Sequence, residues 1–264
     1  NLARRIPLEV RGDVLALFTS LLEAAPAPWS FLQVLGSNVV CGTSPELALS
    51  VRGRALRTCP VKGTRPRGRD AVEDAAAALA LDEDPKERAE LTMAVDVHRN
   101  DLGRVAVPGS VHVPFSPRVV GGRTVWSRMT EVLAMRAPGV PLEDVARAVL
   151  PCGSITGAPK VRAMEVIARL EPHRRGAYTG VFGWVGRGGQ HGMSRRPDQG
   201  EQGERLELAM AIRTLRWDAG SGEGEYFAGG GIVADSVPER ELDETRWKAA
   251  QLRALEVGRE ADSR

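Results

Sequence analysis

The sequence predicts an α+β fold, and three features of its 264 residues lead to that class. Short β-branched and apolar runs are interspersed with helical patterns, but without the regular strand–helix–strand alternation of a parallel sheet. A hydrophobic fraction of 42% is sufficient for the core of a full-sized domain. No segment is repeated along the chain. We therefore expect one domain, residues 1–264, in which strands and helices are mixed.

Charge and cysteine content narrow the functional class. Lys and Arg total 36 against 34 for Asp and Glu, so the net charge of +2 does not suggest a nucleic-acid binder. No apolar run approaches the ~18 residues of a membrane span. Cys41, Cys59 and Cys152 are odd in number and far apart, which favours free thiols in a cytoplasmic protein. Asn1 is not a typical start, and we expect a segment upstream of it.

The first part of the chain predicts one helix among strands. Residues 8–10 end a strand, and Asp13 is a suitable N-cap for the apolar-periodic run that follows it. Segments 30–35 and 38–41 predict a β-hairpin, and residues 47–51 predict another strand.

Residues 60–68 form a basic segment with unusual backbone constraints. Its two prolines exclude a helix, and its two glycines permit positive φ or a close backbone approach. The segment therefore holds Lys62 and Thr64 at defined positions on a rigid loop or strand edge. Taken alone, it is either a basic surface turn or an anion site in which Lys62 acts as nucleophile, base or charge clamp.

Helices and short strands alternate irregularly over the remaining residues. Residues 70–81 predict a helix, and Asp84 followed by Pro85 begins a second helix that ends near Asn100. The other expected helices are 142–149, 161–170 and one that begins at Pro238. The expected strands are 105–107, 111–113, one within 124–135, 178–185, 206–215, 225–227 and 232–234. The expected loops are 151–160, a mobile 186–205, a tight turn at 228–231 and a charged tail at 256–264.

Two of the predicted helices carry carboxylates three residues apart. Glu87 and Glu90 share a face of one helix, and Glu241 and Glu244 share a face of the other. Such pairs are common on solvated helix faces, and acids near a helix start are favoured by the macrodipole. Two pairs on separate helices also suit a hard divalent cation such as Mg²⁺, which prefers oxygen ligands. Both interpretations remain open from the spacing alone.

Two glycine-containing segments are suited to anions. Residues 151–160, which include Thr156, bring small and hydroxyl side chains to the start of a helix. Their spacing is not that of a P-loop, so nucleotide kinase chemistry is not expected. Gly229, Gly230 and Gly231 follow a strand and expose backbone amides. A plain loop-to-helix junction and an ordinary hairpin are the alternatives.

Arg213 is unusual because it interrupts a strand of small and apolar residues. An arginine in such a place needs an anionic partner, and its planar fork fits a carboxylate. The partner is either a ligand or an internal acid. Tyr178, one of two tyrosines, lies in a comparable strand and is either a ligand contact or part of the core.

Taken together, these motifs resemble the chorismate-utilising enzymes, a family that includes aminodeoxychorismate, anthranilate, isochorismate and salicylate synthases. The matching segments are SPE (44–46), PVKGTRPRG (60–68), RNDLGRV (99–105), GSITGAPK (153–160), AIRT (211–214) and GGGIVADS (229–236). They occur in the family's order and span most of the chain. The resemblance implies the chorismate-binding fold, with mostly antiparallel sheets flanked by helices, but without the family's usual N-terminal region.

The resemblance also implies roles for individual residues. Glu46 is expected to protonate the departing C4 hydroxyl of chorismate. The Mg²⁺ ligands are expected to be Glu87, Glu90, Glu241 and Glu244. The substrate-binding residues are expected to be Thr64, Thr156, Tyr178, Arg213, Gly229, Gly230, Gly231 and Lys248.

Lys62 distinguishes branches of the family. Lysine at this place is similar to aminodeoxychorismate synthase component I, whereas anthranilate synthases usually carry alanine. The resemblance implies that Lys62 attacks C2, that ammonia then adds at C4, and that a separate glutamine amidotransferase supplies the ammonia. The product would be a para-aminobenzoate precursor of folate or of a secondary metabolite.

The chain departs from the family pattern at Ser127, where a histidine is usual. Three hypotheses follow. The preferred one is aminodeoxychorismate synthase component I. The second is anthranilate synthase component I or a water-using isochorismate or salicylate synthase. The third is a truncated homologue that binds a partner without catalysis.

Overall fold

The strands of the protein form two five-stranded sheets and one three-stranded sheet. The computed structural model describes residues 1–187 and 203–252. The first sheet contains, in spatial order, β1 (Leu2–Glu9), β13 (Glu223–Gly230), β12 (Thr214–Asp218), β3 (Asn38–Ser44) and β2 (Trp29–Leu35). The second contains β10 (Val181–Arg187), β11 (Glu204–Met210), β4 (Leu47–Arg52), β5 (Ala55–Cys59) and β9 (Val132–Met135). The small sheet contains β6 (Val61–Pro66), β8 (Val125–Met129) and β7 (Arg118–Gly121).

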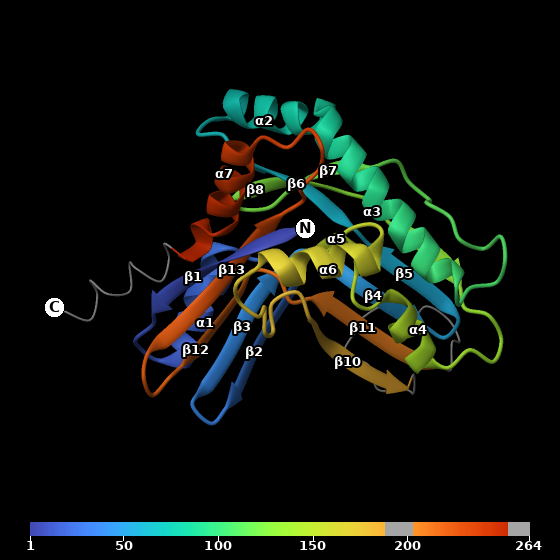
Figure 1. Cartoon of the computed structure of the whole chain (residues 1–264), viewed down its shortest axis with the longest axis horizontal. Helices are drawn as coiled ribbons and strands as arrows, with labels where there is room; N and C mark the ends of the chain where they lie inside the picture. The colour runs from blue at the N-terminus through green and yellow to red at the C-terminus, as the bar shows by residue number, and fades with distance from the viewer. Residues whose placement is uncertain (188–202, 253–264) are drawn as a thin grey trace.

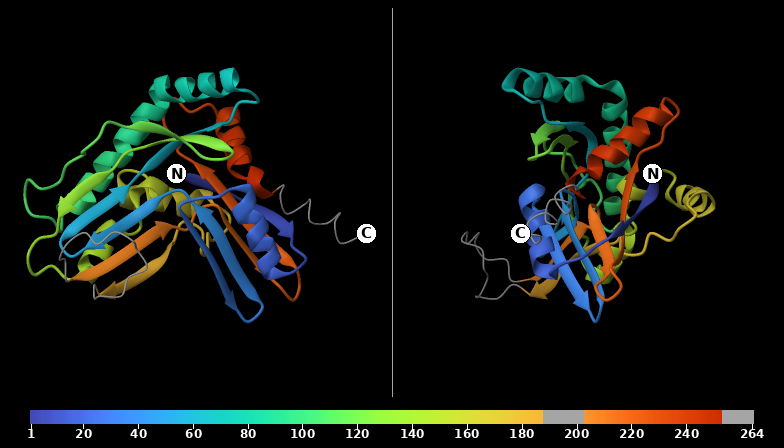
Figure 2. Two further views of the ribbon diagram at one scale, coloured as in Figure 1. Left: turned by 180° about the vertical axis from the view of Figure 1, so that it is seen from behind. Right: turned by 90° about the vertical axis from the view of Figure 1, so that its left-hand side faces the viewer.

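Every neighbouring pair of these strands is antiparallel, so the predicted α+β class with antiparallel sheets is confirmed. The two large sheets splay apart, and helices lie over the end where they approach each other (Figure 1). Seen from behind, the small sheet lies beneath α2 (Figure 2).

Helices cover the sheets on several sides. They are α1 (Val14–Ala24), α2 (Ala71–Glu83), α3 (Pro85–Gly103), α4 (Leu142–Val149), α5 (Gly153–Thr156), α6 (Lys160–Leu170), α7 (Pro238–Lys248) and a short 3₁₀ turn, Ala250–Leu252. Asp13, Asp70 and Asp84 cap α1, α2 and α3 by accepting backbone N–H bonds, which confirms the predicted starts. None of the helices in the described ranges is long and apolar enough to cross a membrane.

Two hydrophobic clusters hold these layers together. One packs the second sheet against α3 and α4, with Leu49, Leu102 and Val145 at its centre. The other packs the first sheet against α1, and includes Leu21 and Tyr226. Each large sheet therefore has its own core, and the segments that join the two sheets are free to carry polar groups.

Several predicted strands differ from the observed ones. Residues 206–215 are not one strand but two, β11 and β12, which belong to different sheets. Arg213 lies between them with φ +54°, a conformation uncommon for a residue with a Cβ atom. The predicted turn at 228–231 is also wrong, because β13 continues to Gly230 and pairs with Leu2 of β1. A partner more than 200 positions away leaves no local signal.

Other differences have local causes. Residues 124–135 contain two strands, β8 and β9, rather than one, and β5 and β7 were not predicted. Segments 105–107 and 111–113 make only isolated bridges, and 232–234 is not a strand. Segment 60–68 is mostly strand β6, and 151–160 contains the short helix α5. The expected loop 186–205 is strand at both ends; its middle, 188–202, and the tail 256–264 lie outside the described residues.

Candidate active site

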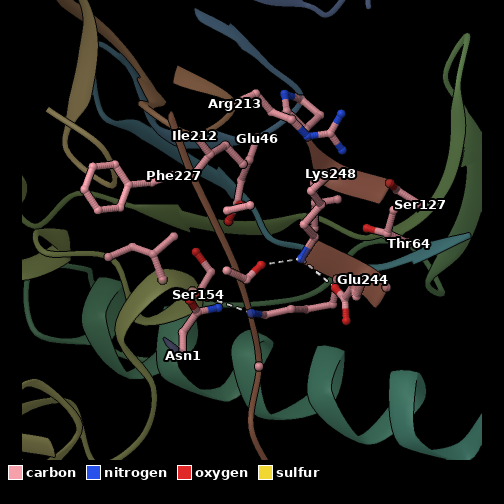
Figure 3. Close-up of a pocket in the computed structure, with 18 of the residues that line it drawn as sticks. Asn1, Glu46, Thr64, Ser127, Ser154, Ile212, Arg213, Phe227, Glu244 and Lys248 are labelled. Carbon is pink, nitrogen blue, oxygen red and sulfur yellow. Dashed lines mark hydrogen bonds and ion pairs between the residues drawn. The ribbon is translucent and has the colours of Figure 1, made fainter. Parts of the chain in front are cut away.

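A pocket opens where the two large sheets, the small sheet, α5 and α7 meet (Figure 3). Ten residues expected from the sequence line it: Glu46, Lys62, Thr64, Glu90, Tyr178, Arg213, Gly229, Gly231, Glu244 and Lys248. They come from β6, α3, β13, α7 and the segments between strands, and Glu46 lies just before β4. The fold therefore assembles side chains that are separated by up to about 200 positions in the sequence.

Lys62 reaches the pocket because β6 is irregular at this point. The β6–β8 register shifts between Lys62 and Arg65, and Gly63 has φ +73°. A Cβ atom at Gly63 would lie 2.8 Å from Leu81 and 2.9 Å from a carboxylate oxygen of Glu87, so only glycine fits. Lys62 Nζ donates a hydrogen bond of 2.6 Å to a backbone carbonyl, that of Ser154.

The environment of Lys62 favours its neutral form. Burial lowers the pKa of Lys62, and the nearby Lys248 ammonium lowers it further, against the opposing charges of Glu46 and Glu90. No carboxylate in the described ranges forms an ion pair with Lys62. An amine held by a neutral carbonyl rather than by a carboxylate is available as a nucleophile.

Glu46 is the buried acid beside this amine. Its side chain is almost fully enclosed at the start of β4, and its carbonyl accepts a 3.0 Å bond from the Met210 N–H. Burial raises the pKa of Glu46, against the charge of Lys62. Its Oε1 has no hydrogen-bond partner among the described residues. A carboxyl whose pKa is raised in this way is better suited to donate a proton to a leaving group.

The other end of the pocket is acidic and ion-paired. Lys86 Nζ lies 2.5 Å from Glu241 and 3.3 Å from Glu90, and Lys248 Nζ lies 2.5 Å from Glu244. Burial alone would lower the pKa of Lys86, but its bond to Glu241 and the charge of Glu90 raise it instead. Burial alone would raise the pKa of Glu244, but Lys248 brings it below its ordinary value.

Glu87 belongs to none of these ion pairs. Burial and the charges of Glu244 and Glu90 raise the pKa of Glu87 to about 7. Glu87, Glu241 and Gly230 do not line the pocket itself but lie directly behind it. The Glu87 carboxylate lies next to Gly63, and the Glu241 carboxylate lies next to Gly230.

The acidic end has donor chemistry that fits a divalent cation. Glu90 Oε1 and Glu241 Oε2 are buried and accept no hydrogen bond within the described chain. Gly230 and Gly231 make room for the carboxylates: a Cβ atom at Gly231 would lie 2.5 Å from Glu90 Oε2. The oxygens are not gathered to metal-ligand distance, since no three acidic, His or Cys side chains of residues 1–187 and 203–252 converge that closely. The residues fit Mg²⁺, whereas their present arrangement is an ion-pair network with Lys86 and Lys248.

Arg213, Tyr178 and Lys248 border the remaining wall. Tyr178 stacks on Phe227 with ring centroids 5.4 Å apart, and burial raises the pKa of Tyr178 to about 12. Its phenol therefore stays protonated and can donate. Lys248 Nζ also donates to the Gly229 carbonyl at 2.9 Å, which holds β13 beside α7. Three donors that line the same pocket suit the carboxylates of an organic anion.

Some placements were not foreseen. Thr156 lies outside the pocket, and its hydroxyl donates to the Cys152 carbonyl at 3.0 Å as part of α5. Ser154, Ile155 and Phe227 line the pocket but were not singled out from the sequence. Ser154 and Ile155 lie in the glycine-containing segment 151–160, so its anion-site character was the available signal. No feature of the sequence indicated that Phe227 would line the pocket.

Comparison with known proteins gives a consistent result. Residues 1–254 match the model of the chorismate binding enzyme family. The chain is 40% identical to anthranilate synthase component 1 of Streptomyces coelicolor over 95% of its own length and 46% of that relative's. It is also 40% identical to aminodeoxychorismate synthase component 1 of Bacillus subtilis, over 92% of its length and 48% of the relative's. The chain thus spans about half the length of the curated relatives it matches.

Solved structures agree with the fold. Anthranilate synthase component I from Streptococcus pneumoniae superposes with a TM-score of 0.75 at 32% identity, covering 94% of this chain and 51% of that one. An isochorismate synthase from Bacillus anthracis gives a TM-score of 0.78 at 27% identity, covering 96% of this chain and 65% of that one.

Proposed function

This chain belongs to the family of chorismate binding enzymes, and from that premise we propose that it aminates chorismate at C4 to give 4-amino-4-deoxychorismate. The observation that carries this proposal is the state of Lys62. Its amine is bonded to the Ser154 carbonyl, has no carboxylate partner among the described residues, and has a lowered pKa. A surface or purely structural lysine gains nothing from such a site.

The substrate is held by the two ends of the pocket. Arg213, Tyr178 and Lys248 are placed to bind carboxylate oxygens, as their positions along one wall allow. Glu90 and Glu244 would hold Mg²⁺ most directly, supported by Glu87 and Glu241. When bound, the metal would neutralise the ring carboxylate and fix its position. The ring then lies between Lys62 and Glu46.

Lys62 and Glu46 act in the first displacement. The neutral Lys62 amine bonds to C2, the conjugated electron pairs shift toward C4, and the C4–O bond breaks. Glu46 gives its proton to the departing hydroxyl, which leaves as water. The intermediate carries a secondary ammonium at C2, and Glu46 is left as a carboxylate. A single difficult substitution is thereby divided into two steps.

Ammonia completes the reaction. It bonds to C4, the electron pairs shift back, and the C2–N bond breaks to release neutral Lys62. The new C4 ammonium passes one proton to Glu46, which restores the acid. The overall change is chorismate plus ammonia to 4-amino-4-deoxychorismate plus water. A glutamine amidotransferase subunit in the cytoplasm is the proposed source of the ammonia.

Anthranilate synthesis is the second candidate, because anthranilate synthases and aminodeoxychorismate synthases match this chain at the same identity of 40%. The product decides between them. The purified chain is incubated with chorismate, Mg²⁺ and ammonium chloride, and the products are separated and weighed by mass spectrometry. We expect 4-amino-4-deoxychorismate, with pyruvate retained. Free pyruvate and fluorescent anthranilate would reject the proposal in favour of the second candidate.

A further inference from the structure

An ion pair behind the pocket has no role in the chemistry above. The Arg175 guanidinium donates two bonds to the Glu171 carboxylate, from Nε to Oε2 at 2.8 Å and from Nη2 to Oε1 at 2.6 Å. The side chain of Arg175 is 13% exposed and that of Glu171 is 7% exposed, and neither lines the pocket. Two parallel bonds fix the plane of the guanidinium, so the pair is held in one geometry.

The pair joins segments that are distant in the sequence. Arg175 Nη1 donates to the Ile155 carbonyl of α5 at 3.0 Å and lies 3.4 Å from the hydroxyl oxygen of Thr179. Glu171, directly after α6, accepts a 2.8 Å bond from the Ala3 N–H of β1. A single ion pair therefore ties α5 and β1 to the segment that follows α6.

That segment contains an uncommon backbone conformation. Thr179 has φ +66°, and Arg213 is the other non-glycine residue with positive φ within 1–187 and 203–252. Such a conformation is costly for a β-branched residue and persists where the surroundings impose it. The Thr179 N–H donates to the Ala211 carbonyl at 2.7 Å, and the Ala211 N–H donates to the Gly180 carbonyl at 2.8 Å. These bonds connect the segment to the joint between β11 and β12, two residues before Arg213.

Both ends of this connection carry residues of the pocket. Tyr178 directly precedes Thr179, and its ring centroid lies 5.9 Å from the Arg175 guanidinium carbon. The Tyr178 N–H donates to the Arg175 carbonyl at 3.1 Å. Ile155, Tyr178 and Arg213 all line the pocket. The ion pair thus acts on the pocket through its neighbours, without lining it.

We propose that Arg175 and Glu171 are positioning residues for the groups that bind the carboxylates of chorismate; this inference rests on the proposed function. Without the paired guanidinium, Thr179 can relax to negative φ, which moves Tyr178 and loosens the joint before Arg213. The acidic end is carried by α3 and α7, whereas the pair joins α5, β1 and the segment after α6. Binding of chorismate therefore depends on the pair, and binding of Mg²⁺ does not.

A neutral replacement of the whole pair tests the inference. Glu171→Gln combined with Arg175→Met removes both charges, so that neither is left buried without its partner, and the Gln oxygen can still accept the Ala3 N–H. We expect the dissociation constant of chorismate, measured by calorimetry, to rise by about tenfold or more. The dissociation constant of Mg²⁺ alone is expected to change by less than about twofold. Arg175→Lys keeps a cation beside Glu171 without the planar fork, and its chorismate affinity is expected to fall by about threefold.

A second buried arginine pair is the matched control. Arg136 is also 13% exposed and lies 2.9 Å from Glu204, and neither residue lines the pocket. Glu204→Gln combined with Arg136→Met is expected to leave chorismate binding unchanged. Thermal melts show which variants fold, and Arg175→Lys carries the test if the neutral replacement of its pair does not fold.

Three outcomes overturn the inference. They are unchanged chorismate affinity in the folded Arg175 variants, an equal loss of chorismate and Mg²⁺ affinity, and an equal loss of chorismate affinity in the control pair. The second and third would indicate a general structural effect rather than positioning. Failure of the wild type to bind chorismate instead rejects the proposed function, and the inference with it.

Discussion

The two ends of the pocket use the same residue types in opposite ways. Lys62, Lys86 and Lys248 are all half-buried lysines close to buried glutamates. Lys86 and Lys248 touch carboxylates at 2.5 Å, whereas Lys62 touches a backbone carbonyl at 2.6 Å. The pKa of Lys86 is raised, and that of Lys62 is lowered. Burial is the main cause that lowers the pKa of Lys62, and the bond to Glu241 outweighs the weaker burial of Lys86, so burial and the bonded partner together set the direction of each shift.

Because of this difference, the two ends of the pocket are suited to different functions. A network of lysines and glutamates is suited to bind ions, because its carboxylates can bind a cation and its ammonium groups an anion when the ligands replace the internal pairs. A buried amine with a lowered pKa beside a buried carboxyl with a raised pKa is suited to covalent chemistry, because each shift favours the form that the proposed reaction uses. Lys62 and Glu46 are the second kind of pair. The first three substitutions below each affect one end and leave the other intact, and the last one changes the glycine between them.

The largest effect is expected at Lys62. Lys62→Met keeps the length of the side chain but removes the nucleophile, and we expect ammonia-dependent turnover to fall by about a thousandfold or more. Chorismate and Mg²⁺ binding, measured by calorimetry, is expected to persist because the acidic end is unchanged. Lys62→Arg is a matched control that retains a cation without a neutral amine, and it is expected to be equally inactive. Appreciable turnover in either variant would exclude Lys62 as the nucleophile.

Glu46 is expected to have the next largest effect and to set a pH limit. In the proposed reaction Glu46 acts as an acid with a raised pKa, so activity is expected to fall as pH rises through that pKa. Lys62 acts as a nucleophile with a lowered pKa, so activity is expected to fall as pH drops through that one. Glu46→Gln cannot donate a proton, and we expect turnover to fall by about a hundredfold or more. The residual rate is expected to lose its alkaline limb while keeping the acid limb. A profile of kcat against pH that keeps its alkaline limb in Glu46→Gln would assign that limb to another group.

The acidic end is expected to show its effect mainly in the metal requirement. Glu244→Gln removes a charged oxygen that we propose as a Mg²⁺ ligand, together with the partner of Lys248, and we expect the Mg²⁺ concentration for half-maximal activity to rise by about tenfold or more. Glu239→Gln, on an exposed turn of α7, is the matched control and is expected to retain the wild-type requirement. Isothermal titration of Mg²⁺ in the presence of chorismate gives the same comparison without turnover. Unchanged Mg²⁺ dependence in Glu244→Gln would remove it from the ligand set.

The sequence predicted the parts of the site whose structure is set locally. Glu87 and Glu90 lie near the start of a capped, proline-initiated helix, so the spacing was sufficient to predict that they share a face. The Lys62 segment was readable as a rigid backbone because its prolines and glycines act within a few residues. The backbone conformation at Arg213 and the extension of β13 to Gly230 depend on strands that are far away in the sequence. They could therefore not be predicted from local sequence. Ser154 is a similar case, because its carbonyl matters only once Lys62 is placed beside it.

The smallest expected effect concerns the glycine that joins the two ends. Gly63 has φ +73°, and a Cβ atom there would approach both Leu81 and Glu87, so Gly63→Ala must displace the ends of those two side chains or the backbone beside Lys62. We expect a loss of about 1–3 kcal/mol in the free energy of unfolding, together with reduced turnover. Gly36→Ala is the matched control, because Gly36 also has positive φ, +62°, but has open space around it. Its cost is expected to be about 1 kcal/mol, from the backbone conformation alone. Denaturant unfolding of both variants isolates the part due to the close approach, and equal losses would show that the spacing between Lys62 and the acidic end does not depend on this glycine.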